Sequence, residues 1–478
     1  MDVKTTYAQT YKLNMGDAGL RGMLIKDILT DYAATDEDRK DLWRRYEQTL
    51  GSLPIDDKES SDISKANNKL KHDFRGEIID SQTSYFIGIS VSYITDKDMD
   101  EKKKDKVREF VDDNNLEDAD NEIATRCAVC GSAGRLYYQL GGKFWIKNLF
   151  PWEAKVVHDD VTGKPLFGIY YYEVVDLNGG RITHAEFYDA TTVQYFVQVG
   201  DNFIPDEYNY DLPEYADKSE TTKETIYPHG FSEVPIVEFT NNNRKRGDFE
   251  KVEALIDAYD LVSSLNIDDI EELREAYLFL KNMTLTVTQK ALLKKYHLLE
   301  TLNEAADAKY ITKNINPEHI NSTLDRLKSD IYRLSQTVDF SDESFAGGGL
   351  SGESRKYKLL AMENRRLSKV VAFKKALDKQ FKLLATGWSL LNSMEIDAND
   401  IYYEFTPNIP QDLSYYAEVA TKLKGMISHR TILDMLPSTL VSDTDYELKL
   451  MKEEQDAYMS LMDMQSDETD EDDSEDEE

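Results

Sequence analysis

The chain has 478 residues, of which 40% are hydrophobic and 11% aromatic, and its formal net charge is −34. This length and composition provide for two or more folded cores and exclude general disorder. No apolar run approaches about 18 residues, so a membrane span is excluded. Two cysteines exclude a disulfide scaffold, and the lack of a secretory signal pattern predicts synthesis in the cytoplasm.

The N-terminal half changes from helical to strand-like patterns. Apolar spacing over residues 16–50 predicts two helices, and the segment from Asn67 predicts a helix that ends near Gly88. From Arg135 to Phe239, short alternating segments are separated by Gly-Gly, Thr-Gly-Lys-Pro and Asn-Gly-Gly. This pattern is typical of antiparallel strands. The sequence therefore predicts an α+β fold with a β-rich region inserted among helices.

The next part of the chain predicts two helices on either side of a small αβ segment. Asp248 is placed to cap a helix that runs to about Lys281. The segments that follow are predicted to be a strand, a helix, a strand and a second long helix, over residues 284–288, 290–300, 308–312 and 318–336.

A glycine-rich segment at 338–352 leads into a long helical pattern over 351–391. The pattern predicts one buried apolar stripe, made of Tyr357, Leu360, Leu367, Val371, Leu377, Phe381, Leu384, Trp388 and Leu391. Between Glu353 and Lys382 there are ten Lys or Arg and three acidic residues, although the chain as a whole is acidic. Beyond it the sequence predicts a strand and shorter helices, at 402–405, 413–424, 430–435 and 442–462. Residues 463–478 include eleven acidic residues and are expected to be disordered.

Catalytic motifs are weak in this sequence. A dinucleotide-binding glycine pattern occurs at Gly347, Gly349 and Gly352. A polar segment, not a strand, precedes it, and Glu353 stands where a phosphate-binding loop requires Lys. Cys127 and Cys130 lack the second ligand pair of a zinc site and are predicted to fill a core. No cofactor and no metal ion are expected, and the sequence favours a protein that is not an enzyme.

An ordered series of short segments runs through residues 60–455. It includes Tyr85-Phe-Ile-Gly88, Gly134-Arg-Leu-Tyr-Tyr138, Val234-Pro-Ile-Val-Glu-Phe239, Leu255-Ile-Asp-Ala-Tyr-Asp260 and Asp339-Phe-Ser-Asp-Glu-Ser-Phe-Ala-Gly347. In this order the segments resemble the portal proteins of tailed phages, in particular those of siphoviruses that infect Gram-positive bacteria.

The resemblance implies a portal fold with long stem helices, a small αβ clip, a β-rich wing inserted among helices, and a helical crown. Its parts would be the N-terminal helices (1–60), wing (61–247), stem helix (248–282), clip (283–316), stem helix (317–337), tunnel loop (338–352), long wing and crown helix (353–393), crown (394–462) and acidic tail (463–478).

The resemblance also implies a location and partners. The chain would form a ring, usually a dodecamer, at the portal vertex of the capsid in the virion, after assembly in the host cytoplasm. Double-stranded DNA would pass through the ring. The protein partners would be the terminase large subunit, the head-tail adaptor, the scaffold and the major capsid protein, and no membrane is involved.

Three groups of residues would carry these contacts. The tunnel loop would bring to the DNA channel Ser344, Phe345, Ala346, Gly347, Gly348, Gly349 and Leu350. The stem would line the channel with Arg326, Lys328 and Arg333, unless these cations pair with neighbouring acids. The clip would dock terminase or adaptor through Thr284, Thr286, Lys290, Lys294 and Lys295.

Three alternatives stay open at this point. An acidic, metal-dependent DNA-processing enzyme would use carboxylate-bound Mg²⁺. An adaptor would bind a basic partner through the acidic tail. The glycine-rich segment would be a plain linker between two helices.

Overall fold

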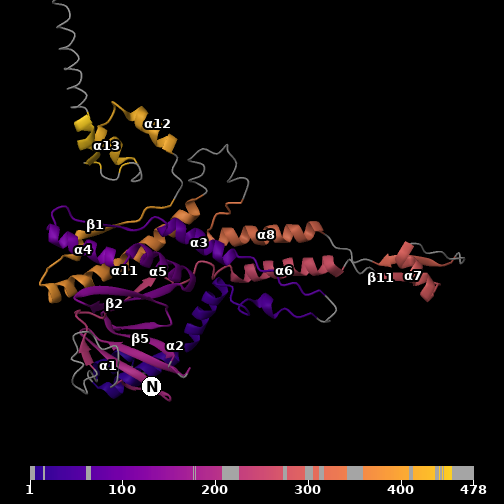
Figure 1. Cartoon of the computed structure of the whole chain (residues 1–478), viewed down its shortest axis with the longest axis horizontal. Coiled ribbons are helices and arrows are strands. Elements are labelled where there is room, and N and C mark those ends of the chain that lie inside the picture. The colour runs from indigo at the N-terminus through magenta and orange to yellow at the C-terminus, as the bar shows by residue number, and fades with distance from the viewer. Residues whose placement is uncertain are drawn as a thin grey trace, which may run out of the picture. The chain divides into compact units, whose positions relative to one another are not determined.

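The computed structural model describes residues 6–13, 17–60, 66–175, 177, 179–206, 226–272, 277–296, 305–311, 317–341, 359–408, 413–436, 441, 444 and 446–454. The chain divides into two compact units, Met1–Asn408 and Ile409–Glu478. Helices and strands both contribute to the first unit (Figure 1), which confirms the predicted α+β class.

The α-helices of the first unit are α1 (Tyr7–Leu13), α2 (Ala18–Tyr46), α3 (Phe74–Ile87), α4 (Glu101–Asp113), α5 (Leu116–Cys130), α6 (Glu253–Glu272), α7 (Val287–Tyr296), α8 (Pro317–Ser335) and α11 (Leu360–Asn392). Two short 3₁₀ turns are η1 (Pro54–Asp57) and η2 (Ala398–Asp400). The strands are β1 (Ser92–Thr95), β2 (Ser132–Leu140), β3 (Lys143–Leu149), β4 (Ala154–His158), β5 (Pro165–Val175), β6 (Arg181–Tyr188), β7 (Thr192–Val199), β8 (Asn202–Pro205), β9 (Ile226–Pro228), β10 (Ile236–Thr240), β11 (Tyr277–Lys281), β12 (Asp307–Ile311) and β13 (Ile401–Glu404).

Aspartates begin several helices by accepting backbone hydrogen bonds from the first turn. Asp17 accepts from the backbone of Gly19 at 2.9 Å, and Asp73 accepts from Gly76 at 3.0 Å. Asp100 caps α4 in the same way. The acidic run that begins at Asp96 therefore leads into a helix.

The strands form antiparallel sheets of different sizes. The largest has the order β4-β5-β6-β7-β8, with β9 also paired to β7, and a three-stranded sheet has the order β10-β2-β3. Two ribbons pair β1 with β13 and β11 with β12. In the longest pairing, Gly168 lies opposite Tyr188 and Val175 opposite Arg181.

Four apolar clusters hold these layers together. Helix α2 covers the large sheet through Ile25 and Ile28, which pack with Phe187. Gly22 of α2 lies so close to this sheet that an added Cβ would be 2.2 Å from the carbonyl oxygen of Phe203. The other clusters lie between the two sheets, between α11 and the three-stranded sheet, and where α3, α5, α6 and α8 meet.

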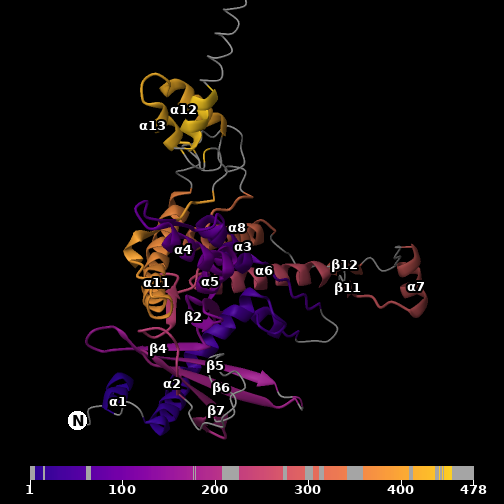
Figure 2. The same cartoon turned by 60° about the vertical axis from the view of Figure 1, so that its left-hand side comes forward.

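Helices α6 and α8 lie side by side (Figures 1 and 2), and the chain between them forms β11, α7 and β12. The helix predicted from Asp248 to about Lys281 is shorter at both ends, because it begins at Glu253 and its described part ends at Glu272. Residues 277–281, predicted to be helical, pair with β12 instead. This segment, Tyr-Leu-Phe-Leu-Lys, begins with a short continuous apolar run, and such a run fits a strand as well as a helix.

Two further helical predictions required correction. Residues 16–50 were predicted to form two helices, but 18–46 form the single helix α2. The apolar stripe predicted along the long helix is correct at Leu377, Phe381, Leu384 and Trp388, which are buried. It is wrong farther upstream, where Leu360, Leu367 and Val371 are exposed and where Arg366 and Lys369 are buried instead. Charged partners, described below, explain why this part of α11 buries cations.

The second unit is described in helical pieces. They are α12 (Leu413–Leu423), α13 (His429–Asp434) and a helical stretch at 446–454. Ser428 caps α13, since its hydroxyl accepts the backbone N–H of Thr431 at 3.2 Å. The predicted acidic tail, 463–478, lies outside the described residues.

Candidate functional site

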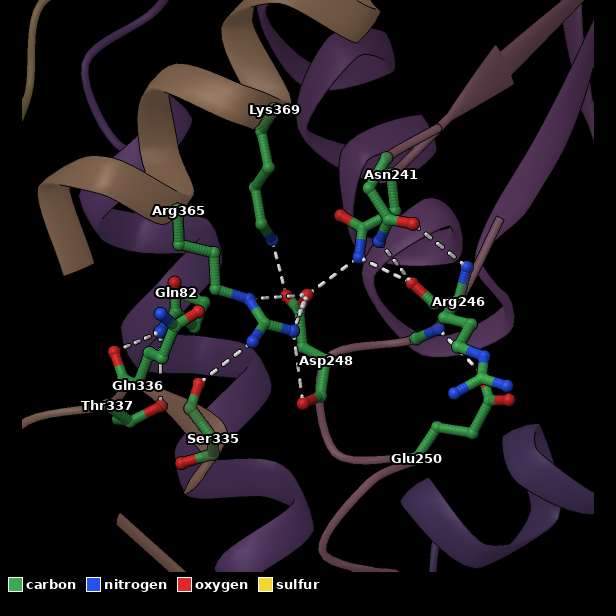
Figure 3. A network of polar contacts seen from close by, with 12 residues as sticks. Gln82, Asn241, Arg246, Asp248, Glu250, Ser335, Gln336, Thr337, Arg365 and Lys369 are labelled. Atoms are coloured by element: carbon green, nitrogen blue, oxygen red, sulfur yellow. Dashed lines mark hydrogen bonds and ion pairs between the residues drawn. The ribbon is translucent and has the colours of Figure 1, made fainter. Parts of the chain in front are cut away.

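The glycine-rich segment follows helix α8 and precedes helix α11. Residues 342–358 lie outside the described part of the chain. They include all the tunnel-loop residues that were predicted to face the DNA channel, Ser344, Phe345, Ala346, Gly347, Gly348, Gly349 and Leu350. The two flanks of the segment are described, up to Ser341 and from Leu359. The site that the structure offers therefore consists of these flanks and the side chains that hold them (Figure 3).

Asp248 is the centre of this site. Its Oδ1 accepts hydrogen bonds from Asn241 Nδ2 at 2.6 Å and Arg365 Nη2 at 2.7 Å, and its Oδ2 accepts one from Lys369 Nζ. The Asp248 side chain is fully buried, and those of Arg365 and Lys369 are 11% and 5% exposed. Arg365 and Lys369 are four residues apart on α11, so one face of this helix supplies both cations.

These partners explain the charge state of the site. Burial by itself raises the pKa of a carboxyl group, but Lys369, Arg365 and Asn241 lower the pKa of Asp248 below its usual value. Burial lowers the pKa of Lys369, while Asp248 acts in the opposite direction. Asp248 is therefore not the helix cap predicted from the sequence but the anion of a buried ion-pair network.

The same network fixes the end of helix α8. Arg365 Nη1 donates to the carbonyl oxygen of Ser335 at 3.0 Å. Gln82 of α3 donates to the carbonyl oxygen of Gln336 at 2.9 Å and to Thr337 Oγ1 at 3.1 Å (Figure 3). Carbonyl groups at a helix end need such partners. We call the set Gln82, Asn241, Asp248, Ser335, Gln336, Thr337, Arg365 and Lys369 the junction.

The predicted stem cations lie on α8 with different surroundings. Lys328 forms an ion pair with Asp339 at 2.8 Å, and its hydrogen bond to Asp339 raises its pKa. Arg333 pairs with Asp330 one turn earlier at 2.7 Å, and its side chain is 66% exposed. Arg326 is exposed. Lys328 and Arg333 thus pair with neighbouring acids, Asp339 and Asp330, as the alternative to a channel-lining role predicts.

The predicted clip residues lie in and before helix α7. Thr284, Lys290 and Lys295 are exposed, and the side chain of Lys294 lies outside the described residues. Thr286 and Gln289 exchange hydrogen bonds at the start of α7: the Thr286 N–H donates to Gln289 Oε1 at 3.0 Å, and Thr286 Oγ1 accepts the Gln289 N–H at 3.4 Å. This is the Thr-x-x-Gln capping pattern. Its presence in the sequence marks the start of α7, which we had predicted at Lys290.

Sequence reasoning also missed a row of acids on α6. Glu253 and Asp257 both pair with Arg75, at 2.9 and 2.5 Å, and Asp260 pairs with His72 at 2.8 Å. Their spacing of three and four residues places the acids on one helix face. That spacing was a visible signal, whereas their partners before and in α3 lie almost 200 residues away.

Among the described residues, no group of three or more His, Cys, Asp or Glu side chains is arranged to hold a metal ion. Cys127 and Cys130 are free and buried in α5, in agreement with the prediction that they fill a core. Within the described part of the chain, no helix has the length and apolar character needed to cross a membrane.

Comparison with known proteins gives consistent matches. The sequence pattern of the family described as "Phage portal protein, SPP1 Gp6-like" matches residues 9–460. The portal protein of Clostridium phage phiCD119 is 24% identical over 417 residues, which cover 84% of this chain and 88% of that relative. The portal protein of Bacillus phage SPP1 is 25% identical over 311 residues, covering 64% of this chain and 58% of that longer relative.

Proposed function

The chain belongs to the SPP1 Gp6-like family of phage portal proteins, and on this premise we propose that it forms the ring-shaped DNA conduit at one vertex of a tailed-phage head. Such a ring serves genome packaging, retention and ejection. The observation that carries the proposal is the family match over residues 9–460, because it spans both compact units of the chain. The family is structural, so the hypothesis of an acidic DNA-processing enzyme is dropped.

The proposed parts of the conduit follow the sequence boundaries. Helices α6 and α8 form the stem, and β11, α7 and β12 form the clip. The contact between α6 and α8 supports this division. Because the chain runs out along α6 and returns along α8, the segment between them, β11, α7 and β12, can lie at the far end of the helix pair. The wing comprises the sheets with α3 to α5, α11 joins wing and crown, and 394–462 form the crown.

The tunnel loop is proposed to face DNA at the narrowest part of the channel. The junction supports this role, because it holds the chain on both sides of the segment, at residues 335–337 and at Arg365 and Lys369. A net charge of −34 repels a duplex, so sparse cations on α8 suffice to guide DNA without holding it tightly. Arg326, Lys328 and Arg333 are the proposed guides, of which Lys328 and Arg333 would exchange their acidic partners, Asp339 and Asp330, for DNA phosphates.

The clip is proposed to dock first the terminase large subunit and later the head-tail adaptor, through Thr284, Thr286, Lys290, Lys294 and Lys295. The scaffold and the major capsid protein are the proposed partners during head assembly. We further propose twelve subunits in the ring, with assembly in the host cytoplasm and a final place in the virion.

Negative-stain electron microscopy of the purified protein tests the conduit. Closed rings with a central channel are expected, and class averages give the subunit number. A protein that stays monomeric at every concentration and ionic strength contradicts the proposal.

The tunnel loop is tested separately by replacing Gly347, Gly348 and Gly349 with proline. Rings should still form, because the glycines lie outside the junction, while DNA packaging should fall. Unchanged packaging would leave this segment as a plain linker.

A further inference from the structure

A polar cleft of about 430 Å³ opens beside the junction. Its walls come from residues 241–244 and 246–248, which follow β10, from Lys251 just before α6, from Gln336 just after α8 and from one face of α11. Every side chain that lines it is polar or charged except that of Gly247. Such a lining does not suit an apolar ligand or the apolar face of a partner helix.

The charge of this cleft is opposite to that of the chain. Five Lys or Arg and one Asp line it, in a protein of net charge −34. Asp248, the one acid, already contacts both Arg365 and Lys369 at the floor. We call this space the basic cleft.

The cations at its mouth are available. Arg244, Arg246 and Lys251 are exposed, and none of their side chains has an ion pair or hydrogen bond with another described residue. Asn364 and Ser368, four residues apart on α11, add uncharged polar groups to the wall. Like charges that surround a cavity concentrate the electrostatic field inside it and attract anions.

The backbone that carries two of these cations is held firmly. Asn242 Oδ1 accepts the backbone N–H groups of Arg244 at 3.0 Å and Arg246 at 3.3 Å, and Asn242 Nδ2 donates to the carbonyl oxygen of Arg246 at 2.7 Å. Gly247 is so close to α5 that an added Cβ would be 2.3 Å from the carbonyl oxygen of Val129. The turn that presents Arg244 and Arg246 is therefore preorganised.

We propose that the basic cleft binds a phosphate group, through Arg244, Arg246 and Lys251 at its mouth. Guanidinium groups form paired hydrogen bonds with phosphate oxygens, and Lys adds a compact charge. The floor contributes one further net positive charge beneath them. The phosphate belongs either to a nucleic-acid backbone or to the free ion, since both present the same oxygens. None of the described loop residues, 338–341, lines the cleft, and phosphate binding there does not require the ring.

Thermal unfolding of the full chain in sodium phosphate, against sodium chloride of equal ionic strength, tests the proposal. Phosphate should raise the melting temperature of the wild type in a saturable way. The double variant Arg246→Gln/Lys251→Gln should bind phosphate about a hundredfold more weakly, or about tenfold for each cation removed. Lys374→Gln, which removes an exposed cation of α11 outside the cleft, is the matched control and should bind like the wild type.

A second arm identifies the source of the phosphate. A short DNA duplex that competes with phosphate in the wild type but not in the double variant assigns the site to a nucleic-acid backbone. Binding of phosphate without such competition assigns it to the free ion. Three results overturn the proposal: no effect of phosphate beyond that of chloride, equal binding by the wild type and the double variant, or equally strong competition by poly-glutamate.

Discussion

The C-terminal part of helix α8 has a buried side and an exposed side, and their ion pairs differ. On the buried side lie Ile331, Tyr332 and Ser335, and the neighbouring Asp248–Lys369 pair has no more than 5% side-chain exposure. On the exposed side the charges are open to solvent, as in the pair of Arg333, 66% exposed, with Asp330, 30% exposed. An ion pair of the first kind is costly to break, while one of the second kind contributes little.

The buried ion pairs stabilise the fold, whereas the exposed charges of α8 can also contact other molecules. Three helices and the segment after β10 meet at the junction, so each polar group there must be paired within the chain. Along the exposed part of α8, water can replace any lost partner. The following predictions test this contrast, beginning with the largest effect.

Replacing Asp248 with Asn should lower the free energy of unfolding by about 3–5 kcal/mol, because two cations would remain buried without their anion. Urea unfolding followed by tryptophan fluorescence measures the change. The control is Asp339→Asn, which removes an acid from the partly exposed pair of Lys328 and Asp339. A loss below about 1 kcal/mol for Asp248→Asn would remove the contrast between buried and exposed ion pairs.

Lys369→Met should cost less, about 1–3 kcal/mol, because Asp248 keeps Arg365 and Asn241 but one of its buried oxygens loses a donor. In the double variant Asp248→Asn/Lys369→Met, one of the two buried cations that Asp248→Asn leaves behind is also removed, and Arg365 remains. The double variant should therefore be more stable than the sum of the single losses predicts. Additive losses would show that Asp248 and Lys369 act independently.

The sequence predicted local structure better than it predicted this junction. Gly88 as a helix end, the antiparallel region and the helix over 318–336 follow from caps, turns and apolar spacing, which are local signals. Asp248 was assigned a local role as a cap because its partners, Arg365 and Lys369, lie more than 100 residues away. The exposed Leu360, Leu367 and Val371 were assigned to the core because apolar spacing does not reveal where a helix buries charge.

Asp339→Asn should lower the free energy of unfolding by only about 0.2–1 kcal/mol, because solvent screens its pair with Lys328. Burial raises the pKa of Asp339, but hydrogen bonds from Lys328 and Ser341 outweigh it and lower the pKa. A carboxyl whose folded pKa is lowered stabilises the fold above its unfolded pKa of about 3.9, and this contribution is lost as the pH falls through the folded value. The wild type and the variant should therefore differ at pH 7 and converge in acid, as urea unfolding across this range would measure. A gap that widens in acid would contradict the assignment of Asp339 as a paired carboxylate.

The smallest change in stability is expected for Arg333→Gln, within about 0.5 kcal/mol of the wild type, because Asp330 stays solvated after its partner is lost. The same variant also examines the proposed channel. If Arg333 guides DNA, packaging should change while ring formation and stability do not, and Arg326→Gln should behave alike because Arg326 is also exposed on α8. A loss of stability above about 1 kcal/mol would show that Arg333 belongs with the structural charges of the junction. Unchanged packaging in both variants would instead assign these cations to the outer surface of the stem.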